Sequence, residues 1–385
     1  MNPKDYQNRA AGNVVYLPSG YWAFIPNPLP PDIRWTSSLV SALADAEREY
    51  TRLSTSAITF PYPHLFVQPF IRGEAVISSR IEGTRASIID IYTYEINQLS
   101  FLEQANDTRE VHNYVRALDY GIERVKTLPV SLRLFREIHK ILMEGVRGEM
   151  MTPGEFRRSQ NWIGPPGSTL TEAPYVPPPV EEMHNTLNSL EKFIHSDLDI
   201  PQLVKAGLFH YQFEAIHPFL DGNGRIGRLL ISLLLCEWQL QPYPLLNLSI
   251  YFERYRQEYY DHLLSVSRAG TWENWLCFFL RGISLQARDA AKRMESLGAI
   301  RTKYQPIIDH ERNPERMAAV VDFLFSRPVF SIRQIAIELT LPYKTAYDYV
   351  EKLIRARIIR ETTGFSRNRI FQADEILNEY YGDRM

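Results

Sequence analysis

The chain has 385 residues, which is long enough for two or three domains, and 45% of them are hydrophobic, which is enough for a sizeable core. The net charge of -2 excludes no class of partner, so partners have to be inferred from the charge of local segments. The two cysteines, Cys236 and Cys277, lie far apart without a CxxC neighbour, which argues against a zinc site and predicts buried thiols.

Residues 1–35 are rich in proline and glycine and are predicted to wrap a surface without regular structure. The start of the chain lacks the pattern of a secretory signal. The longest apolar run, near LLISLLLCEW, is too short to span a bilayer. The expectation is a cytoplasmic protein with no membrane partner.

From residue 36 onward, apolar residues recur at helical spacing. Helices are predicted at 36–51, 67–82, 85–97, 106–126, 130–146, 180–195, 201–216, 225–240, 252–267, 271–298 and 313–326. Residues 151–180 interrupt this pattern with an extended stretch that has a Gly/Ser/Thr tip, which predicts a β-hairpin or an ordered flap. The predicted fold class is therefore mainly α with a small β-hairpin flap.

The most informative stretch is residues 216–228, IHPFLDGNGRIGR. His217 follows a predicted helix and precedes a proline, which tends to end the helix there. Histidine is the natural general base near neutral pH, so His217 is a candidate catalytic residue. The alternative is a histidine that caps the helix or makes a hydrogen bond in the core.

The residues after His217 predict a phosphate site. Gly222, Asn223 and Gly224 tolerate a turn that points several backbone N–H groups into one concavity, at the start of a helix whose positive dipole end faces the same place. Arg225 and Arg228 follow on the first turn, and arginine suits phosphate oxygens. A carboxylate is unfavourable beside phosphate unless a cation lies between them, so Asp221 is a candidate Mg²⁺ ligand.

The stretch HPFLDGNGRIGR resembles the signature of the Fic (Fido) family, HPFx[D/E]GNGRxxR, at every specified position. FHYQFEAIHPF and the upstream GEFRRSQNWIG…YVPPP also resemble this family, and the resemblance covers roughly residues 60–290. It implies a Fic-type helical core and a protein adenylyltransferase, which moves AMP from ATP to a Ser, Thr or Tyr hydroxyl of a protein and releases pyrophosphate. The protein modified could be the chain itself.

The resemblance also implies roles for individual residues. His217 would take the proton from the hydroxyl, Asp221 would hold Mg²⁺, and the flap would pair with the target as an extra strand. Tyr259 and Tyr260 resemble the positions that lie on the nucleoside side in this family, and the alternative for both is a place on an amphipathic core helix. The residues expected at the ATP site are Glu82, Ile163, His217, Gly222, Asn223, Gly224, Arg225, Ile226, Gly227, Arg228, Tyr259 and Tyr260.

A second motif lies upstream in residues 78–84, SSRIEGT. By itself it is typical of a capped surface helix, but within a Fic protein it matches the inhibitory pattern [S/T]xxxE[G/N] with Ser78, Glu82 and Gly83. Glu82 is expected to pair with Arg228 and to take the space of the γ-phosphate. An alternative role for Glu82 is to position a water that removes AMP from modified targets.

Residues 313–372 resemble a winged helix, with a helix, a turn near Leu341, a second helix and a hairpin that carries Arg367 and Arg369. From Arg327 to Gln372 there are nine Lys/Arg and four Asp/Glu, an excess of five basic charges, which could bind DNA phosphates. A protein-interaction or dimerisation module is the alternative. The predicted division is 1–112 for an N-terminal helical region, 113–298 for the catalytic core and 313–372 for the winged-helix-like part.

Other functions remain open from the sequence. Within the enzyme class these are transfer of UMP or phosphocholine and, less compatible with the intact GNG and Arg225, a kinase-like transfer. From a different class, the alternative is a winged-helix DNA-binding regulator with a Fic-like nucleotide sensor. A homodimer is a further option that the sequence does not decide.

Overall fold

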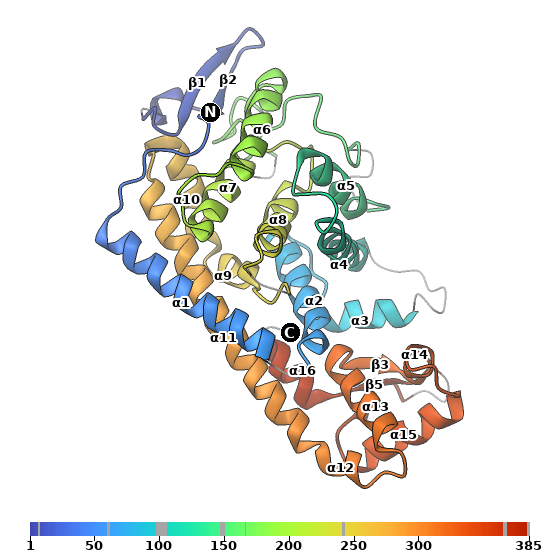
Figure 1. Cartoon of the computed structure of the whole chain (residues 1–385). Helices are drawn as coiled ribbons and strands as arrows, with labels where there is room; N and C mark the ends of the chain where they lie inside the picture. The colour runs from blue at the N-terminus through green and yellow to red at the C-terminus, as the bar shows by residue number, and fades with distance from the viewer. Residues whose placement is uncertain are drawn as a thin grey trace.

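The computed structural model describes residues 1–6, 8–59, 62–97, 106–146, 151–165, 167–240, 243–364 and 368–382. The protein is mostly helical, as the sequence predicts, and Figure 1 shows its helices around a central one, α8. The first helices are α1 (Ser37–Thr59), α2 (His64–Ile81), α3 (Ile88–Asn97), α4 (Asn106–Arg124), α5 (Leu132–Leu142), α6 (Val180–Ile194) and α7 (Gln202–Ile216). They are followed by α8 (Asn223–Glu237), α9 (Leu248–Arg254), α10 (Arg256–Ala269), α11 (Trp272–Lys303) and α12 (Gln305–Asp309).

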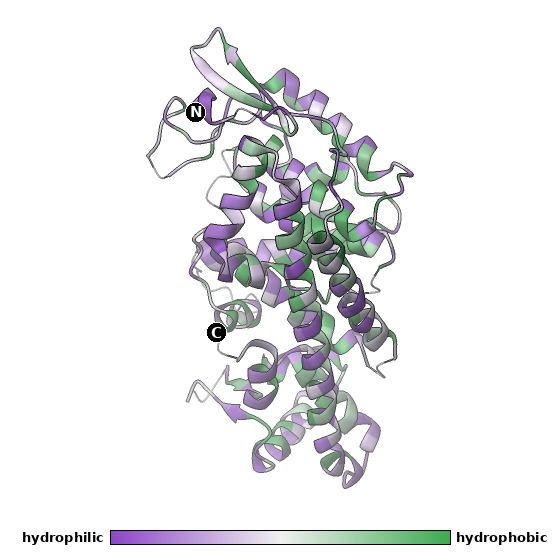
Figure 2. Ribbon diagram, turned by 90° about the vertical axis from the view of Figure 1, so that its left-hand side faces the viewer, coloured by the Kyte–Doolittle hydropathy of each residue, from purple (hydrophilic) through white to green (hydrophobic). Residues whose placement is uncertain are grey.

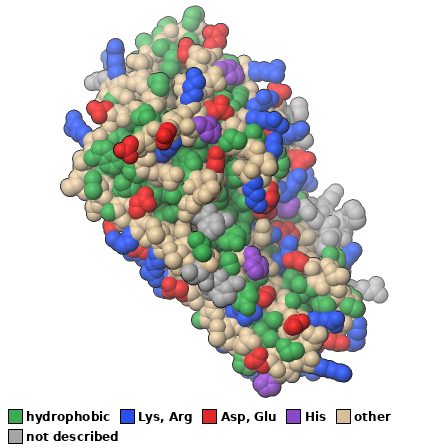
Figure 3. Space-filling view, viewed as in Figure 1, with side chains coloured by type: hydrophobic (Ala, Val, Ile, Leu, Met, Phe, Trp, Pro, Cys, Tyr) green, Lys and Arg blue, Asp and Glu red, His purple; other side chains and the backbone are tan. Residues whose placement is uncertain are grey.

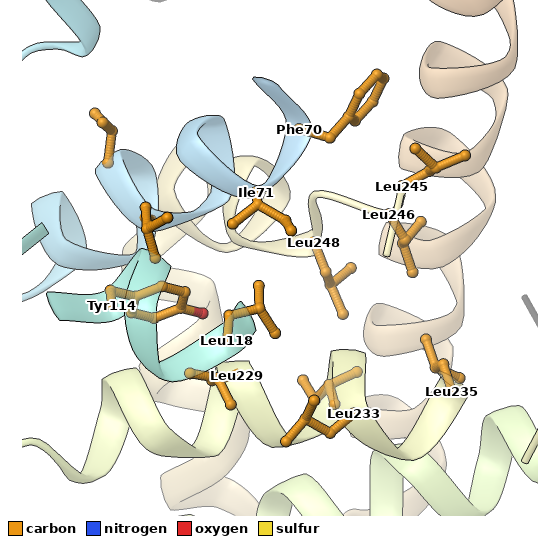
Figure 4. Close-up of a cluster of buried hydrophobic side chains, with 14 of the residues drawn as sticks. Phe70, Ile71, Tyr114, Leu118, Leu229, Leu233, Leu235, Leu245, Leu246 and Leu248 are labelled. Carbon is orange, nitrogen blue, oxygen red and sulfur yellow. The ribbon is translucent and has the colours of Figure 1, made fainter. Parts of the chain in front are cut away.

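Helix α8 is buried almost all round, which explains its uniformly apolar sequence LLISLLL. Figure 4 shows leucines of α8 facing Tyr114 and Leu118 of α4 and Ile71 of α2. At Gly121 of α4 a side chain would overlap Leu233, so this glycine lets the two helices approach closely. Figure 2 shows that hydrophobic residues gather on the inner helices of the molecule. This packing fixes the N-terminus of α8, where the phosphate site is expected.

The N-terminal segment differs from the prediction. Residues 1–35 were expected to lack regular structure, but β1 (Gly12–Leu17) and β2 (Tyr21–Pro26) form an antiparallel hairpin closed by Gly20, whose φ is +88°. The prediction was wrong because Pro18 lies in the turn and Pro26 at the strand end, where proline disturbs no ladder. Phe24, fully buried, anchors the hairpin to the rest of the molecule.

One other expectation needs correction, because the helix expected at 252–267 is divided at Tyr255 into α9 and α10. The region expected to be a β-hairpin or an ordered flap pairs through a single antiparallel bridge between Ile163 and Tyr175 in the part that is described. Its many prolines leave few backbone N–H groups for a longer ladder.

The C-terminal part has the element order expected for it, with one strand and one helix more. Its elements are α13 (Pro314–Ser326), β3 (Val329–Ser331), α14 (Ile332–Glu338), α15 (Tyr343–Arg355), β4 (Arg360–Glu361), β5 (Ile370–Gln372) and α16 (Asp374–Tyr381). The strands form an antiparallel sheet in the order β3-β5-β4. Helix α16 returns to the core, where the Tyr381 hydroxyl donates to the carbonyl oxygen of Pro69 in α2 at 2.9 Å.

Among the helices of the described residues, none combines the length and the apolar character needed to cross a bilayer.

Candidate active site

The loop between α7 and α8 is held in one conformation by its own residues. His217 ends α7 in a left-handed conformation, with φ +49°, and its N–H donates to the Phe213 carbonyl at 3.0 Å. The side chain of Asn223 accepts from the N–H of Phe219 and donates to its C=O, both at 2.8 Å. This asparagine therefore closes the loop with its side chain, and only its backbone remains for a phosphate.

Two side chains from the start of the flap reach the same loop. Arg157 Nε donates to the His217 carbonyl at 3.1 Å, and Asn161 Nδ2 donates to the carbonyls of His217 and Phe219 at 3.1 and 2.9 Å. Neither residue is among those expected at the site from the sequence. Their only signal was the stretch GEFRRSQNWIG, which resembles the family but says nothing of what its side chains touch.

The His217 imidazole is half-buried, and its Nδ1 lies 3.3 Å from the Glu214 carbonyl. Burial lowers the pKa of His217 to about 4, although the Glu214 carbonyl acts to raise it, and the positive charge of Arg157 lowers it further. The ring is therefore neutral at pH 7. With Nδ1–H directed at a carbonyl, the free lone pair is on Nε2, so His217 can accept a proton there.

The N-terminus of α8 is occupied by a carboxylate. Gly222 caps the helix with φ +77°, and at Gly224 any Cβ would overlap Glu82 Oε1. A helix N-terminus offers unpaired N–H groups and positive potential, which suit an anion. Glu82, which follows the last residue of α2, thus lies where a phosphate oxygen is expected to bind.

The same carboxylate pairs with Arg228. Arg228 is buried, with Nη2 at 2.7 Å from Glu82 Oε1, while Nε and Nη2 each lie 2.9 Å from an oxygen of Ser78. Burial by itself would raise the pKa of Glu82, but the charges of Arg228 and Arg225 outweigh it and lower the pKa. Glu82 is therefore ionised at neutral pH, and it forms the pair with Arg228 that the sequence analysis expected. Gly83, with φ +97°, then turns the chain out of the helix.

Arg225 faces a different partner. Its guanidinium is buried and lies 3.2 Å from Glu110 Oε2 of α4, and Thr84 donates to the same oxygen at 3.2 Å. The structure therefore brings Arg228 to Glu82 but places Arg225 in a second, buried ion pair. Because that pair joins the segment after α2 to α4 and α8, it supports the position of Glu82.

The remaining expected residues divide into buried and exposed ones. Tyr259 is buried, and its hydroxyl lies 2.8 Å from His210 Nε2, whereas Tyr260 is 38% exposed and lies under the influence of the charges of Glu82 and Arg228. Ile226 is fully buried, and Gly227 packs against the Glu214 carboxyl. Of the two tyrosines, Tyr260 is the exposed one, and the Arg256 guanidinium lies over its ring at 5.8 Å from the ring centroid.

Asp221 is exposed at the mouth of the loop, and its Oδ1 accepts from the N–H of Gly222 at 2.6 Å. In the described residues no cluster of three or more His, Cys, Asp or Glu could hold a metal. A single carboxylate still fits Mg²⁺, which usually takes one or two protein ligands and fills its shell with phosphates and water. His139 steadies this residue, since its Nε2 lies 3.1 Å from the Asp221 carbonyl.

The flap lies over the loop. Ile163, 38% exposed, pairs with Tyr175, and the Tyr175 hydroxyl donates to the Ala215 carbonyl of α7 at 2.7 Å. Phe24 of β2 donates from its backbone N–H to the Val176 carbonyl at 2.9 Å. The flap is thus held between the N-terminal hairpin and the helix that carries His217.

Comparison with known proteins gives two family matches. Residues 129–235 match the Fic/DOC family, and residues 40–123 match the Fic/DOC family N-terminal region. A probable protein adenylyltransferase of Aquifex aeolicus is 28% identical over 174 residues, which are 45% of this chain and 50% of that protein. The protein adenylyltransferase Fic of Aedes aegypti is 31% identical over 160 residues, 40% of this chain and 29% of that protein. The matches thus span half or less of these relatives.

The fold has a solved counterpart. A Fic family protein from Desulfovibrio desulfuricans superposes with a TM-score of 0.59 at 20% sequence identity, and the superposition covers 90% of this chain and 98% of that one. The two consecutive sequence matches show the Fic/DOC family over residues 40–123 and 129–235, and the solved structure shows the same fold.

Proposed function

We propose that this protein is an adenylyltransferase that moves AMP from ATP to a Ser, Thr or Tyr hydroxyl of a protein and that Glu82 restrains it. One observation carries the proposal: a neutral His217 stands beside a helix N-terminus whose anion position is taken by a carboxylate paired with Arg228. The names of the relatives, protein adenylyltransferases, support the same reaction.

The reaction follows from this arrangement. His217 Nε2 takes the proton of the target hydroxyl, whose oxygen attacks the α-phosphorus of ATP. The bond from that phosphorus to the bridging oxygen breaks, and pyrophosphate leaves with the electron pair. The N–H groups at the start of α8 and the Arg228 guanidinium stabilise the negative charge on the phosphates. Mg²⁺, held at Asp221, would neutralise part of this charge when bound.

Glu82 opposes the reaction in the conformation described. Its carboxylate occupies the helix N-terminus and neutralises Arg228, so the terminal phosphate of ATP would meet a negative charge instead of a positive one. A charge-assisted hydrogen bond of this kind contributes about 1.5–3 kcal/mol, which corresponds to a restraint of about tenfold to a hundredfold.

The test is intact-mass spectrometry after incubation with Mg²⁺ and ATP. We expect Glu82→Gly to add AMP to itself or to an added protein target at least about tenfold faster than the unaltered chain. The double variant with His217→Ala should add none, and Glu123→Gly, an exposed carboxylate on α4, should behave like the unaltered chain. Addition of UMP or phosphocholine when UTP or CDP-choline is supplied, with none from ATP, would contradict ATP as the donor.

Other parts of the prediction stay as predictions. These are the division at 1–112, 113–298 and 313–372, the cytoplasmic location, removal of AMP by a water at Glu82, homodimerisation and DNA binding. No observation on the described residues favours the regulator over the enzyme.

A further inference from the structure

Arg157 is a buried cation at the junction of the flap and the catalytic loop. Its side chain is fully buried, and its donors are used on backbone carbonyls. Nε donates to His217 at 3.1 Å, Nη1 to Ser159 at 3.3 Å and Nη2 to Pro178 at 2.5 Å, and the backbone N–H donates to Pro218 at 2.9 Å. One residue thus ties the start of the flap, its end and the loop that carries His217.

This arrangement is costly, which suggests that it has a function. Burying an unpaired charge is unfavourable, and burial lowers the pKa of Arg157 to about 10. Among the described residues no carboxylate forms an ion pair with Arg157, and the nearby Tyr175 and Tyr21 are uncharged at neutral pH, because burial raises the pKa of both hydroxyls. An ordinary structural arginine would be paired with a carboxylate, as Arg225 is with Glu110.

The carbonyl that Arg157 holds belongs to a strained residue. His217 has φ +49°, and a non-glycine residue in this region is strained, so it keeps this conformation only where its surroundings enforce it. Arg157 and Asn161 both donate to the His217 carbonyl, so the left-handed backbone is fixed from the flap side. The side-chain direction of His217 depends on this backbone conformation.

We propose that Arg157 is a positioning residue for His217: its guanidinium fixes the backbone of the base and joins it to the flap. The inference rests on the proposed function, because it takes His217 as the general base. It implies that the flap and the base move as one unit, so that a target seated on the flap is aligned with Nε2.

The charge has a consequence for pH dependence. The groups that act on His217 are Arg157 from the flap, the carboxylates of Glu82 and Asp221, and the Glu214 carbonyl of its own helix. Burial lowers the pKa of His217 most, the carboxylates and the carbonyl raise it, and Arg157 lowers it. Removal of the Arg157 charge should therefore raise the pKa of His217 and move the acid limb of activity to higher pH.

The experiment uses the full chain in the Glu82→Gly background and four further variants. Arg157→Gln removes both the positive charge and the planar guanidinium with its several N–H donors, whereas Arg157→Lys keeps the charge and loses the guanidinium. Asn161→Ala removes two hydrogen bonds to the loop without any change of charge. Arg158→Gln is the matched control, because the side chain of that neighbour is 84% exposed and pairs with Glu155 at the surface. Transfer is followed against pH and ATP concentration, and the His217 ring is titrated by NMR, assigned with His217→Ala.

For Arg157→Gln we expect kcat to fall about tenfold to a hundredfold with the KM for ATP unchanged, since a small misplacement of a catalytic group has effects of this size. The acid limb of its pH profile should move to higher pH, and the NMR pKa of His217 should rise. Arg157→Lys and Asn161→Ala should both have a lower kcat than the Glu82→Gly parent. The acid limb of their pH profiles should lie at the same pH as in the parent. Arg158→Gln should match the parent in both.

An unchanged kcat and His217 pKa in folded Arg157→Gln would overturn the proposal, as would equal changes in Arg158→Gln. If Arg157→Gln does not fold, Arg157→Lys and Asn161→Ala decide: full activity in both would overturn it. The failure of the proposed function gives a different result. In that case the Glu82→Gly parent transfers nothing from ATP, while the NMR titration still shows whether Arg157 sets the pKa of His217.

Discussion

At the scale of single residues, the site gathers ionisable groups whose charges oppose one another. Glu214, on α7 one turn before His217, places its Oε1 in a buried position where no described group donates a hydrogen bond. The oxygen packs against Gly227, where a side chain would leave no space for it. Burial raises the pKa of Glu214 to about 8, an effect that Arg228 opposes and Glu82 reinforces.

This carboxyl should make the stability of the protein depend on pH. Between about pH 4.5 and 8 the folded chain keeps the proton of Glu214 that the unfolded chain loses, so the free energy of unfolding falls as pH rises through this window. In Glu214→Gln the fall should be smaller by about 2 kcal/mol, with partial exposure of the side chain taken into account.

Urea unfolding at pH 5 and pH 8 measures this difference. Glu181→Gln, an exposed carboxylate at the start of α6, is the control and should keep the full pH dependence of the unaltered chain. Equal slopes in all three proteins would mean that Glu214 is ionised in the fold.

At the scale of elements, the N-terminal hairpin and the segment before it support the flap. Besides the hydrogen bond from Phe24 to Val176, the Tyr6 hydroxyl donates to the Pro174 carbonyl at 2.7 Å, and Phe24 packs on Tyr175 with ring centroids 5.9 Å apart. A flap with one bridge of its own depends on such outside support. The hairpin therefore contributes to the site without facing it.

Phe24→Ala should loosen the flap. Removal of a fully buried phenylalanine costs about 3–5 kcal/mol, and the cavity lies directly behind Tyr175. We expect faster hydrogen exchange at the Ile163 and Tyr175 amides and a severalfold higher KM for the protein target, with ATP binding unchanged. Tyr16→Ala, which removes a side chain 60% exposed on the same hairpin, should change neither.

At the scale of the whole molecule, α2 connects the C-terminal part to the active site. Its first half contacts α13 and α16: the Phe66 and Phe325 rings lie 6.3 Å apart, Tyr381 donates to Pro69, and the Phe70 and Tyr380 rings lie 6.0 Å apart. Its end carries Ser78 and Glu82 at Arg228. In Figure 1, α16 and α2 lie side by side near the C-terminus. The position of Glu82 thus depends on contacts with a part of the chain distant from the site.

Tyr381→Ala should therefore weaken the restraint. We expect AMP transfer to rise severalfold when Glu82 is present and to stay the same in the Glu82→Gly background, because the effect acts through that carboxylate. Tyr343→Ala, 59% exposed on α15, serves as control. An equal rise in both backgrounds would mean that Tyr381 acts on the site by another route.

The charge of the C-terminal part bears on the DNA hypothesis. Several of its basic side chains are neutralised by acids: Lys344 by Asp348, Lys352 by Glu311, Arg360 by Asp374, and Arg369 by Glu351 and Glu361. On the face in Figure 3, blue and red side chains alternate over this part without a continuous basic surface. Arg367, expected on the wing, lies outside the described residues.

Duplex DNA should accordingly bind weakly. The affinity is measured by fluorescence anisotropy between about 50 and 200 mM salt, the range in which phosphate contacts are lost. A plot of log affinity against log salt concentration should fall with a slope of magnitude below about 3. A slope of about 6 or more would mean that these ion pairs open on DNA and would favour the regulator.

The sequence by itself determined the parts of the site that are local in the chain. The end of α7 before the proline, the turn at Gly222 and the start of α8 all follow from backbone preferences within twelve residues. Most helices follow from the spacing of apolar residues. The same reasoning missed the hairpin at residues 12–26, because composition does not tell a proline in a turn from one in a disordered chain.

Only the tertiary structure decided which distant residues meet. Arg228 lies 146 positions from Glu82 in the chain, and this contact was expected only through a family resemblance. Arg157 reaches His217 across 60 positions, and Arg225 turns to Glu110 across 115. Periodicity states which face of a helix is buried, but the partner of a charged side chain depends on how several helices pack around α8, and that packing exists only in the folded chain.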